Sequence, residues 1–94
     1  MLNDSLTILV IDDNPEDREH YYRSLKKISS TGYLCLEAAD GQSGLKIMYD
    51  KAVDCVLLDY SLPGLNGLDV LKNIRTKYPF MPVILLTGQG NENI

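Results

Sequence analysis

Short apolar runs alternate with longer segments of helical spacing along this chain. The apolar runs, rich in Val, Ile and Leu, predict strands at residues 6–11, 33–39, 53–58 and 82–86. Apolar positions three and four residues apart predict three helices. They cover residues 15–28, a segment that opens at 40–43 and runs to near Asp50, and residues 68–77. Apolar strands that alternate with amphipathic helices indicate parallel pairing with helices on both faces. We therefore expect an α/β fold with a doubly wound parallel sheet, as one domain over residues 1–94.

The first predicted helix has a clear start and two faces. Asn14 can cap it, Pro15 suits its first position, and Glu16 and Asp17 suit the positive end of the helix dipole. Its expected inner face holds Tyr21, Leu25 and Ile28, with Tyr22 beside them, and the side chains expected to point to water are Arg18, Arg23, Lys26 and Lys27.

Composition narrows the function classes. The chain has 94 residues, enough for one core, and a net charge of −4 with its basic residues scattered, which argues against direct binding of nucleic acid. No apolar stretch approaches the roughly 20 residues of a membrane span, and the N-terminus lacks a basic region typical of secretion signals. We expect a cytoplasmic protein with no membrane association.

Three residues with reactive side chains have ordinary interpretations. Cys35 and Cys55 lie inside apolar segments without a neighbouring His or Cys, so we expect small buried hydrophobes rather than a disulfide or a metal pair. His20, the single histidine, falls among charged helix residues and is expected to be solvated or partly packed.

Carboxylates are concentrated where the strands are predicted to end. Asp12 and Asp13 follow the first strand, Asp59 ends the third, and Thr87 follows the fourth. Because ligands of open parallel sheets gather at the carboxyl ends of the strands, we expect these groups to meet. Three close carboxylates repel one another, and either a divalent cation or a raised pKa on one of them relieves the repulsion. An all-oxygen cluster favours Mg²⁺ over zinc.

A carboxylate held beside Mg²⁺ is a competent nucleophile toward a phosphoryl group. Asp59, at the end of the central strand, is the candidate nucleophile, and the adjacent pair Asp12 and Asp13 is better placed to hold the metal. Thr87 could hydrogen-bond a phosphoryl oxygen; considered alone, it is equally well explained as a strand-end turn residue.

With those residues in place, the sequence resembles the receiver domain of two-component response regulators. The resemblance rests on ILVIDDNPEDRE, AADGQSGL, VDCVLLDYSLPGLNGLDVLKNIR and PVILLTGQG, which together span nearly the whole chain. It implies a flavodoxin-like receiver fold with strand order 2-1-3-4, to which a fifth strand would add.

The resemblance also implies roles for individual residues. Asp59 would accept a phosphoryl group from a histidine kinase or a histidine phosphotransfer protein, so that the protein is a phosphoacceptor able to catalyse its own phosphorylation and dephosphorylation rather than an enzyme. Asp13 would bind Mg²⁺ directly, Asp12 through water, and Ser61 by its backbone carbonyl. The remaining implied roles are a switch hydroxyl for Thr87, a phosphate contact for the Gly88 N–H, control of water access for Ser61 and Gln89, and loop shape for Pro63 and Gly67.

The C-terminal part departs from the family. Receivers carry a fifth strand that begins near a lysine contacting the phosphoryl group, then two further helices, whereas this sequence stops at Ile94 and has no lysine after Lys77. If these 94 residues are the whole polypeptide, exposed apolar surface and a free sheet edge predict a marginal, strand-swapped or homodimeric protein. Otherwise the sequence is a piece of a longer chain.

Three functions remain open at this stage. The first is a receiver whose phosphorylation switches partner binding, and the second is a phosphate-independent dimerisation or docking module with the same fold. The third is a phosphohydrolase, which is disfavoured because the segment after Asp59 lacks a second aspartate that would act as general acid. Binding of a phosphoryl analogue such as beryllofluoride would distinguish the first two.

Overall fold

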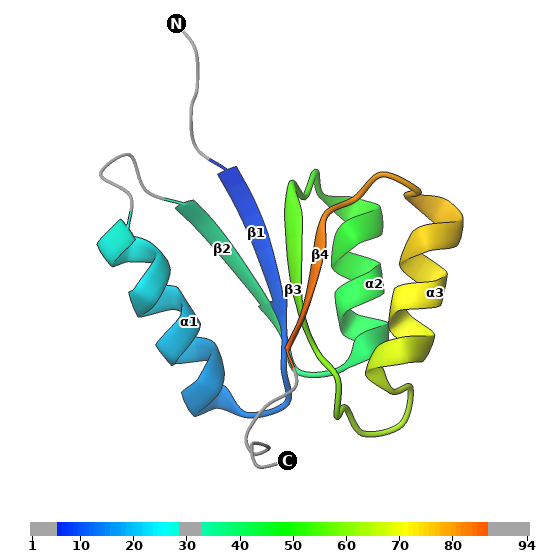
Figure 1. The fold of residues 1–94 in the computed structure, drawn as a ribbon, viewed down its shortest axis with the longest axis horizontal. Helices are drawn as coiled ribbons and strands as arrows, with labels where there is room; N and C mark the ends of the chain where they lie inside the picture. The colour runs from blue at the N-terminus through cyan, green and yellow to red at the C-terminus, as the bar shows by residue number, and fades with distance from the viewer. Residues whose placement is uncertain (1–5, 29–32, 87–94) are drawn as a thin grey trace, which may run out of the picture.

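The computed structural model describes residues 6–28 and 33–86, and within them it contains one four-stranded sheet and three helices (Figure 1). In chain order the elements are β1 (Leu6–Ile11), α1 (Pro15–Ile28), β2 (Tyr33–Ala38), α2 (Gly41–Asp50), β3 (Cys55–Asp59), α3 (Gly67–Lys77) and β4 (Val83–Leu86).

All strand pairs are parallel, and the sheet order is β2-β1-β3-β4, which confirms the predicted fold class and strand order. Helix α1 covers one face of the sheet, while α2 and α3 lie side by side on the other face (Figure 1). This layering buries β1 and β3 in the middle of the sheet. The core between the sheet and the two helices consists of Leu9, Ile11, Ala38, Met48, Val56, Leu58, Leu62, Val70 and Ile74.

Four predicted boundaries were wrong by one or two residues, and strand pairing or hydrogen bonding explains each of them. Strand β2 ends at Ala38 because its partner β1 ends at Ile11. Strand β3 begins at Cys55, two residues later than predicted, because the Asp54 carboxylate accepts the N–H of Thr7 in place of a ladder bond. Strand β4 begins at Val83 since proline at the preceding position has no N–H to donate.

The fourth wrong boundary concerns α3, which begins at Gly67 rather than at residue 68. The Asn66 side chain accepts a hydrogen bond from the Asp69 N–H at 3.0 Å and so caps the helix. The predicted cap of α1 is confirmed, because the Asn14 side-chain oxygen accepts from the N–H groups of Glu16 and Asp17 at 2.8 and 3.4 Å.

The ordinary interpretations of the reactive side chains are largely confirmed. Both cysteines are free but only half-buried, so the expectation that they are buried is met in part. His20 is exposed and makes an edge contact with the ring of Tyr21. In the described residues, no helix is long and apolar enough to span a bilayer.

Candidate functional site

Three carboxylates meet where β1 and β3 end. Asp12 and Asp13 follow β1 directly, and Asp59 is the last residue of β3. Because Ile11 is in register with Leu58 on the neighbouring strand, the residues that follow them come to the same edge of the sheet. One carboxylate oxygen from each aspartate lies within 4.8 Å of the others. The sequence predicted this convergence, and the geometry of the strands produces it.

Burial differs among the three. Asp12 is 3% exposed and Asp59 is 9% exposed, whereas Asp13 faces solvent. The cluster therefore has two carboxylates held in the protein and one at the surface.

Backbone N–H groups orient the two buried side chains. Asp12 accepts a hydrogen bond from the Asn14 N–H at 2.9 Å, and Asp59 accepts one from the Ser61 N–H at 3.0 Å. Each bond occupies one carboxylate oxygen from the loop that follows the strand. The remaining lone pairs of these carboxylates can bind a ligand.

Burial raises the pKa of Asp59, and the negative charge of Asp13 raises it further, while the Ser61 N–H partly offsets both effects. Burial likewise raises the pKa of Asp12, with the Asn14 N–H acting in the opposite direction and Asp59 adding a smaller increase. The charge of Asp13 thus disfavours the ionised form of Asp59, and the charge of Asp59 disfavours the ionised form of Asp12. A cation placed between them would relieve this repulsion.

The negative potential of the cluster reaches α1. Burial raises the pKa of the Tyr21 phenol, and the charges of Asp12, Asp17 and Asp59 raise it further. Among the described residues, no histidine or cysteine joins the cluster. An all-carboxylate donor set with two buried members fits a hard divalent cation such as Mg²⁺.

The loop between β3 and α3 is fixed by two glycines. Gly64 has a φ of 71°, a conformation that favours glycine. At Gly67 an added Cβ would lie 2.6 Å from the Asp59 carbonyl oxygen and 2.7 Å from the Tyr60 Cα, so only glycine allows this approach. The loop-shaping role expected for Gly67 thus has a direct steric basis. The first residue of α3 lies in close contact with the backbone of Asp59.

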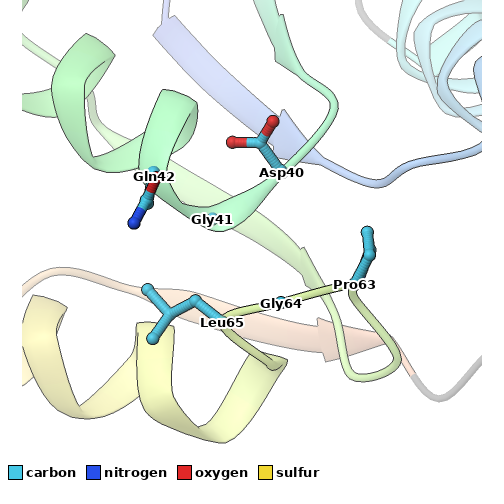
Figure 2. A pocket seen from close by; sticks show the side chains of 6 residues that line it. All are labelled: Asp40, Gly41, Gln42, Pro63, Gly64 and Leu65. Atoms are coloured by element: carbon cyan, nitrogen blue, oxygen red, sulfur yellow. The ribbon is translucent and has the colours of Figure 1, made fainter.

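A separate pocket lies beside the cluster at the same edge of the sheet. Figure 2 shows it between the start of α2 and the β3–α3 loop, lined by Asp40, Gly41, Gln42, Pro63, Gly64 and Leu65. None of the three clustered carboxylates lines it. The Asp40 side chain caps α2 by accepting the Ser43 N–H at 2.8 Å, which lowers its pKa. The ionisable group that lines this pocket is therefore a carboxylate that already caps a helix.

Other predicted site residues have different outcomes. Ser61 is exposed and is seen to act through its N–H, and no contact tests its carbonyl as a ligand. Thr87, Gly88 and Gln89 lie outside the described residues.

Arg18 was wrongly expected to point to water. Its side chain is 17% exposed and donates hydrogen bonds to the Asp12 carbonyl oxygen and to the Glu37 carboxylate. One signal in the sequence could have revealed it: a cation near a helix N-terminus opposes the helix dipole, which calls for a specific partner.

Comparisons with known proteins agree with this geometry. The family model described as the response regulator receiver domain matches residues 8–94. The phosphate regulon transcriptional regulatory protein PhoB of Pseudomonas aeruginosa is 34% identical over 89 residues, which cover 93% of this chain and 38% of PhoB. The chain thus spans well under half the length of this relative.

Two solved structures are similar in fold and sequence. A chain in the crystal structure of the histidine kinase ThkA in complex with the response regulator TrrA matches with a TM-score of 0.81 and 35% identity, over 95% of this chain and 74% of that one. TrrA from Thermotoga maritima in complex with Mg²⁺-BeF matches with a TM-score of 0.79 and 36% identity, over 85% of this chain and 67% of that one. Fold, acidic cluster and family match together show that the chain belongs to the receiver domain family of two-component response regulators.

Proposed function

We propose that this receiver domain accepts a phosphoryl group on Asp59, in a Mg²⁺-dependent reaction, and thereby switches the binding of a partner. The observation that supports this most directly is the cluster itself, in which a buried carboxylate at the end of the central strand lies within 4.8 Å of two others. A role limited to fold stability does not explain it, because charges of one sign brought together in a partly buried site destabilise the folded state.

In this proposal each carboxylate has a separate task. Asp12 and Asp13 would hold the cation, together with Asp59 and, as the family resemblance implies, the Ser61 carbonyl. The cation would neutralise charge on the phosphoryl oxygens and so allow an anionic nucleophile to approach them. The support from a similar protein is that TrrA forms a complex with Mg²⁺-BeF.

In this proposal the surrounding backbone orients the Asp59 carboxylate for attack on phosphorus. The Ser61 N–H donates to one carboxylate oxygen, Oδ1, at 3.0 Å. The other oxygen would form a bond to phosphorus while the bond from phosphorus to the donor's leaving atom breaks, and the leaving group takes up a proton. Hydrolysis of the resulting acyl phosphate restores the carboxylate, so the protein is changed and reset by its own site rather than acting on a separate substrate.

The proposed physiological donor is a phosphohistidine on a histidine kinase or on a histidine phosphotransfer protein. A similar response regulator, TrrA, forms a complex with the kinase ThkA, which supports a kinase as the partner. A phosphorylated histidine is a suitable donor because a protonated imidazole is a good leaving group.

The test is the intact mass of the protein after incubation with acetyl phosphate, with Mg²⁺ or with a chelator. We expect one added phosphate with Mg²⁺ and none with the chelator. Asp59→Asn should remain unmodified, whereas Asp54→Asn should react like the unsubstituted protein, because Asp54 lies just before β3 and its carboxylate is outside the cluster. An unmodified protein in Mg²⁺ would instead favour the phosphate-independent docking module.

A further inference from the structure

Arg18 connects three parts of the fold at the acidic cluster. It lies in α1, and its Nη1 donates to the Asp12 carbonyl oxygen at 2.7 Å while its Nε donates to the Glu37 carboxylate at 2.8 Å. Glu37 belongs to β2, so one guanidinium group ties α1 to the end of β1 and to the neighbouring strand. With 17% of its side chain exposed, Arg18 is largely packed between these elements.

Asp12 is fixed by three hydrogen bonds, of which Arg18 makes one. Its N–H donates to the Ala38 carbonyl at 3.0 Å, its carboxylate accepts from the Asn14 N–H at 2.9 Å, and its carbonyl accepts from Arg18. The first two bonds are made by neighbouring backbone. The third is the side-chain bond that fixes the peptide leading from Asp12 to Asp13.

This third bond opposes a definite force. Three carboxylates within 4.8 Å repel one another, and Asp59 is held within the sheet by its pairing with β4. Without the bond from Arg18, we expect the segment between β1 and α1 to yield to this repulsion. A loop that relaxes outward must be drawn back when a cation binds, and that rearrangement weakens binding.

We propose that Arg18 is a positioning residue for the divalent cation site: through the Asp12 carbonyl, and braced by Glu37, it holds Asp12 and Asp13 in the geometry that binds the cation. This inference rests on the proposed function, since it concerns the same site. Arg18 does not contact the cation in this proposal and acts only through the two aspartates.

Electrostatics alone predicts the opposite effect of removing Arg18. A positive charge beside the cluster repels a second cation, so its loss would tighten Mg²⁺ binding if charge were the only contribution. Positioning predicts that its loss weakens binding. The sign of the change in Mg²⁺ affinity therefore separates the two explanations.

The experiment is a Mg²⁺ titration of the purified protein, followed by NMR of the Ser61 amide, which donates to Asp59. For Arg18→Met we expect the Mg²⁺ dissociation constant to rise about tenfold, which corresponds to about 1.4 kcal/mol. Arg18→Lys should restore only part of the affinity, since an ammonium group keeps a donor but lacks the two fixed donors by which the guanidinium group bonds both the Asp12 carbonyl and Glu37. Arg23→Met is the matched control, because Arg23 lies on the same helix in an exposed pair with Glu19, and its dissociation constant should change less than twofold.

Several outcomes would overturn the inference. Unchanged or tighter Mg²⁺ binding by Arg18→Met would do so, even if that variant melts at a lower temperature, since a purely structural role changes stability without changing the affinity of the folded protein. If Arg18→Met does not fold, Glu37→Ala is compared with Glu19→Ala. Glu37→Ala should raise the Mg²⁺ dissociation constant at least threefold more than Glu19→Ala does. Equal effects of the two substitutions would contradict the proposal. Absence of Mg²⁺ binding by the unsubstituted protein would instead refute the proposed function.

Discussion

Replacing Asp59 with asparagine should stabilise the protein when no divalent cation is present. The substitution removes one charge from a cluster whose oxygens lie within 4.8 Å of one another, and the asparagine oxygen can still accept the Ser61 N–H. At this separation one pair of unit charges costs about 1 kcal/mol in water and about 3.5 kcal/mol at an effective dielectric constant near 20. Asp59 is 9% exposed and Asp13 is open to solvent, so we expect a gain of about 1 to 2 kcal/mol at neutral pH.

The pH dependence of this gain follows from the raised pKa of Asp59. A folded-state pKa above the unfolded value means that stability is greatest below the unfolded pKa and is lost as pH rises through the folded pKa. At pH 7 the unsubstituted protein has lost that stability, and the variant has not. At a pH near 3, Asp59 is largely protonated in both states, so the difference between the two proteins should nearly vanish.

The assay is urea unfolding in a chelator at pH 7 and pH 3, with an unchanged denaturant slope as the check that only stability differs. Asp54→Asn is the matched control, because Asp54 also accepts a backbone N–H, from Thr7 at 2.8 Å, but lies outside the cluster. If Asp59→Asn is no more stable than Asp54→Asn at pH 7, repulsion within the cluster is not a significant cost, and the electrostatic reasoning about this site is wrong.

Three further predictions concern packing and cation binding. Gly67→Ala should lower the free energy of unfolding by at least about 2 kcal/mol in urea titrations, since its Cβ would lie 2.6 Å from the Asp59 carbonyl oxygen and 2.8 Å from that of Tyr60. Ile74→Ala should cost about 2 to 5 kcal/mol in the same assay because Ile74 is fully buried in the core, and a smaller loss would show that the site collapses around the cavity. The Mg²⁺ dissociation constant should rise as pH falls, beginning above the pH of about 4 where exposed carboxylates titrate, because burial raises the pKa of Asp12 and Asp59; calorimetry at several pH values tests this.

The sequence predicted the acidic cluster because the relevant information is local. An apolar run that stops at Asp12 shows where a strand ends, and parallel strands bring their carboxyl ends to one edge. Neither step requires knowledge of side-chain packing. The same holds for the Asn14 cap, which depends on one side chain and the N–H groups next to it.

Arg18 could not be placed by the same reasoning. Helical periodicity separates only apolar from polar positions. It therefore assigns every long polar side chain to solvent, including one that lies along the protein with its charged end bonded inside. Its partners are the Asp12 carbonyl, just after β1, and Glu37 in β2, and the relative register of these two strands is fixed only in three dimensions. The start of β3 was predicted wrongly for a related reason, since Asp54 bonds to Thr7 across 47 positions of sequence.

Fold stability and cation binding oppose each other at this edge of the sheet. The backbone bonds to Asp12 and Asp59, with the guanidinium group of Arg18, hold like charges together in the folded protein, and the unfolded chain is free of that repulsion. A cation that binds only the folded state adds stability that grows with the logarithm of its concentration above the dissociation constant. The protein should therefore be least stable where its proposed ligand is absent. A substitution that relieves the repulsion should stabilise the protein and also weaken cation binding. For Asp59→Asn, the free energy of unfolding without cation should therefore rise while the affinity for Mg²⁺ falls.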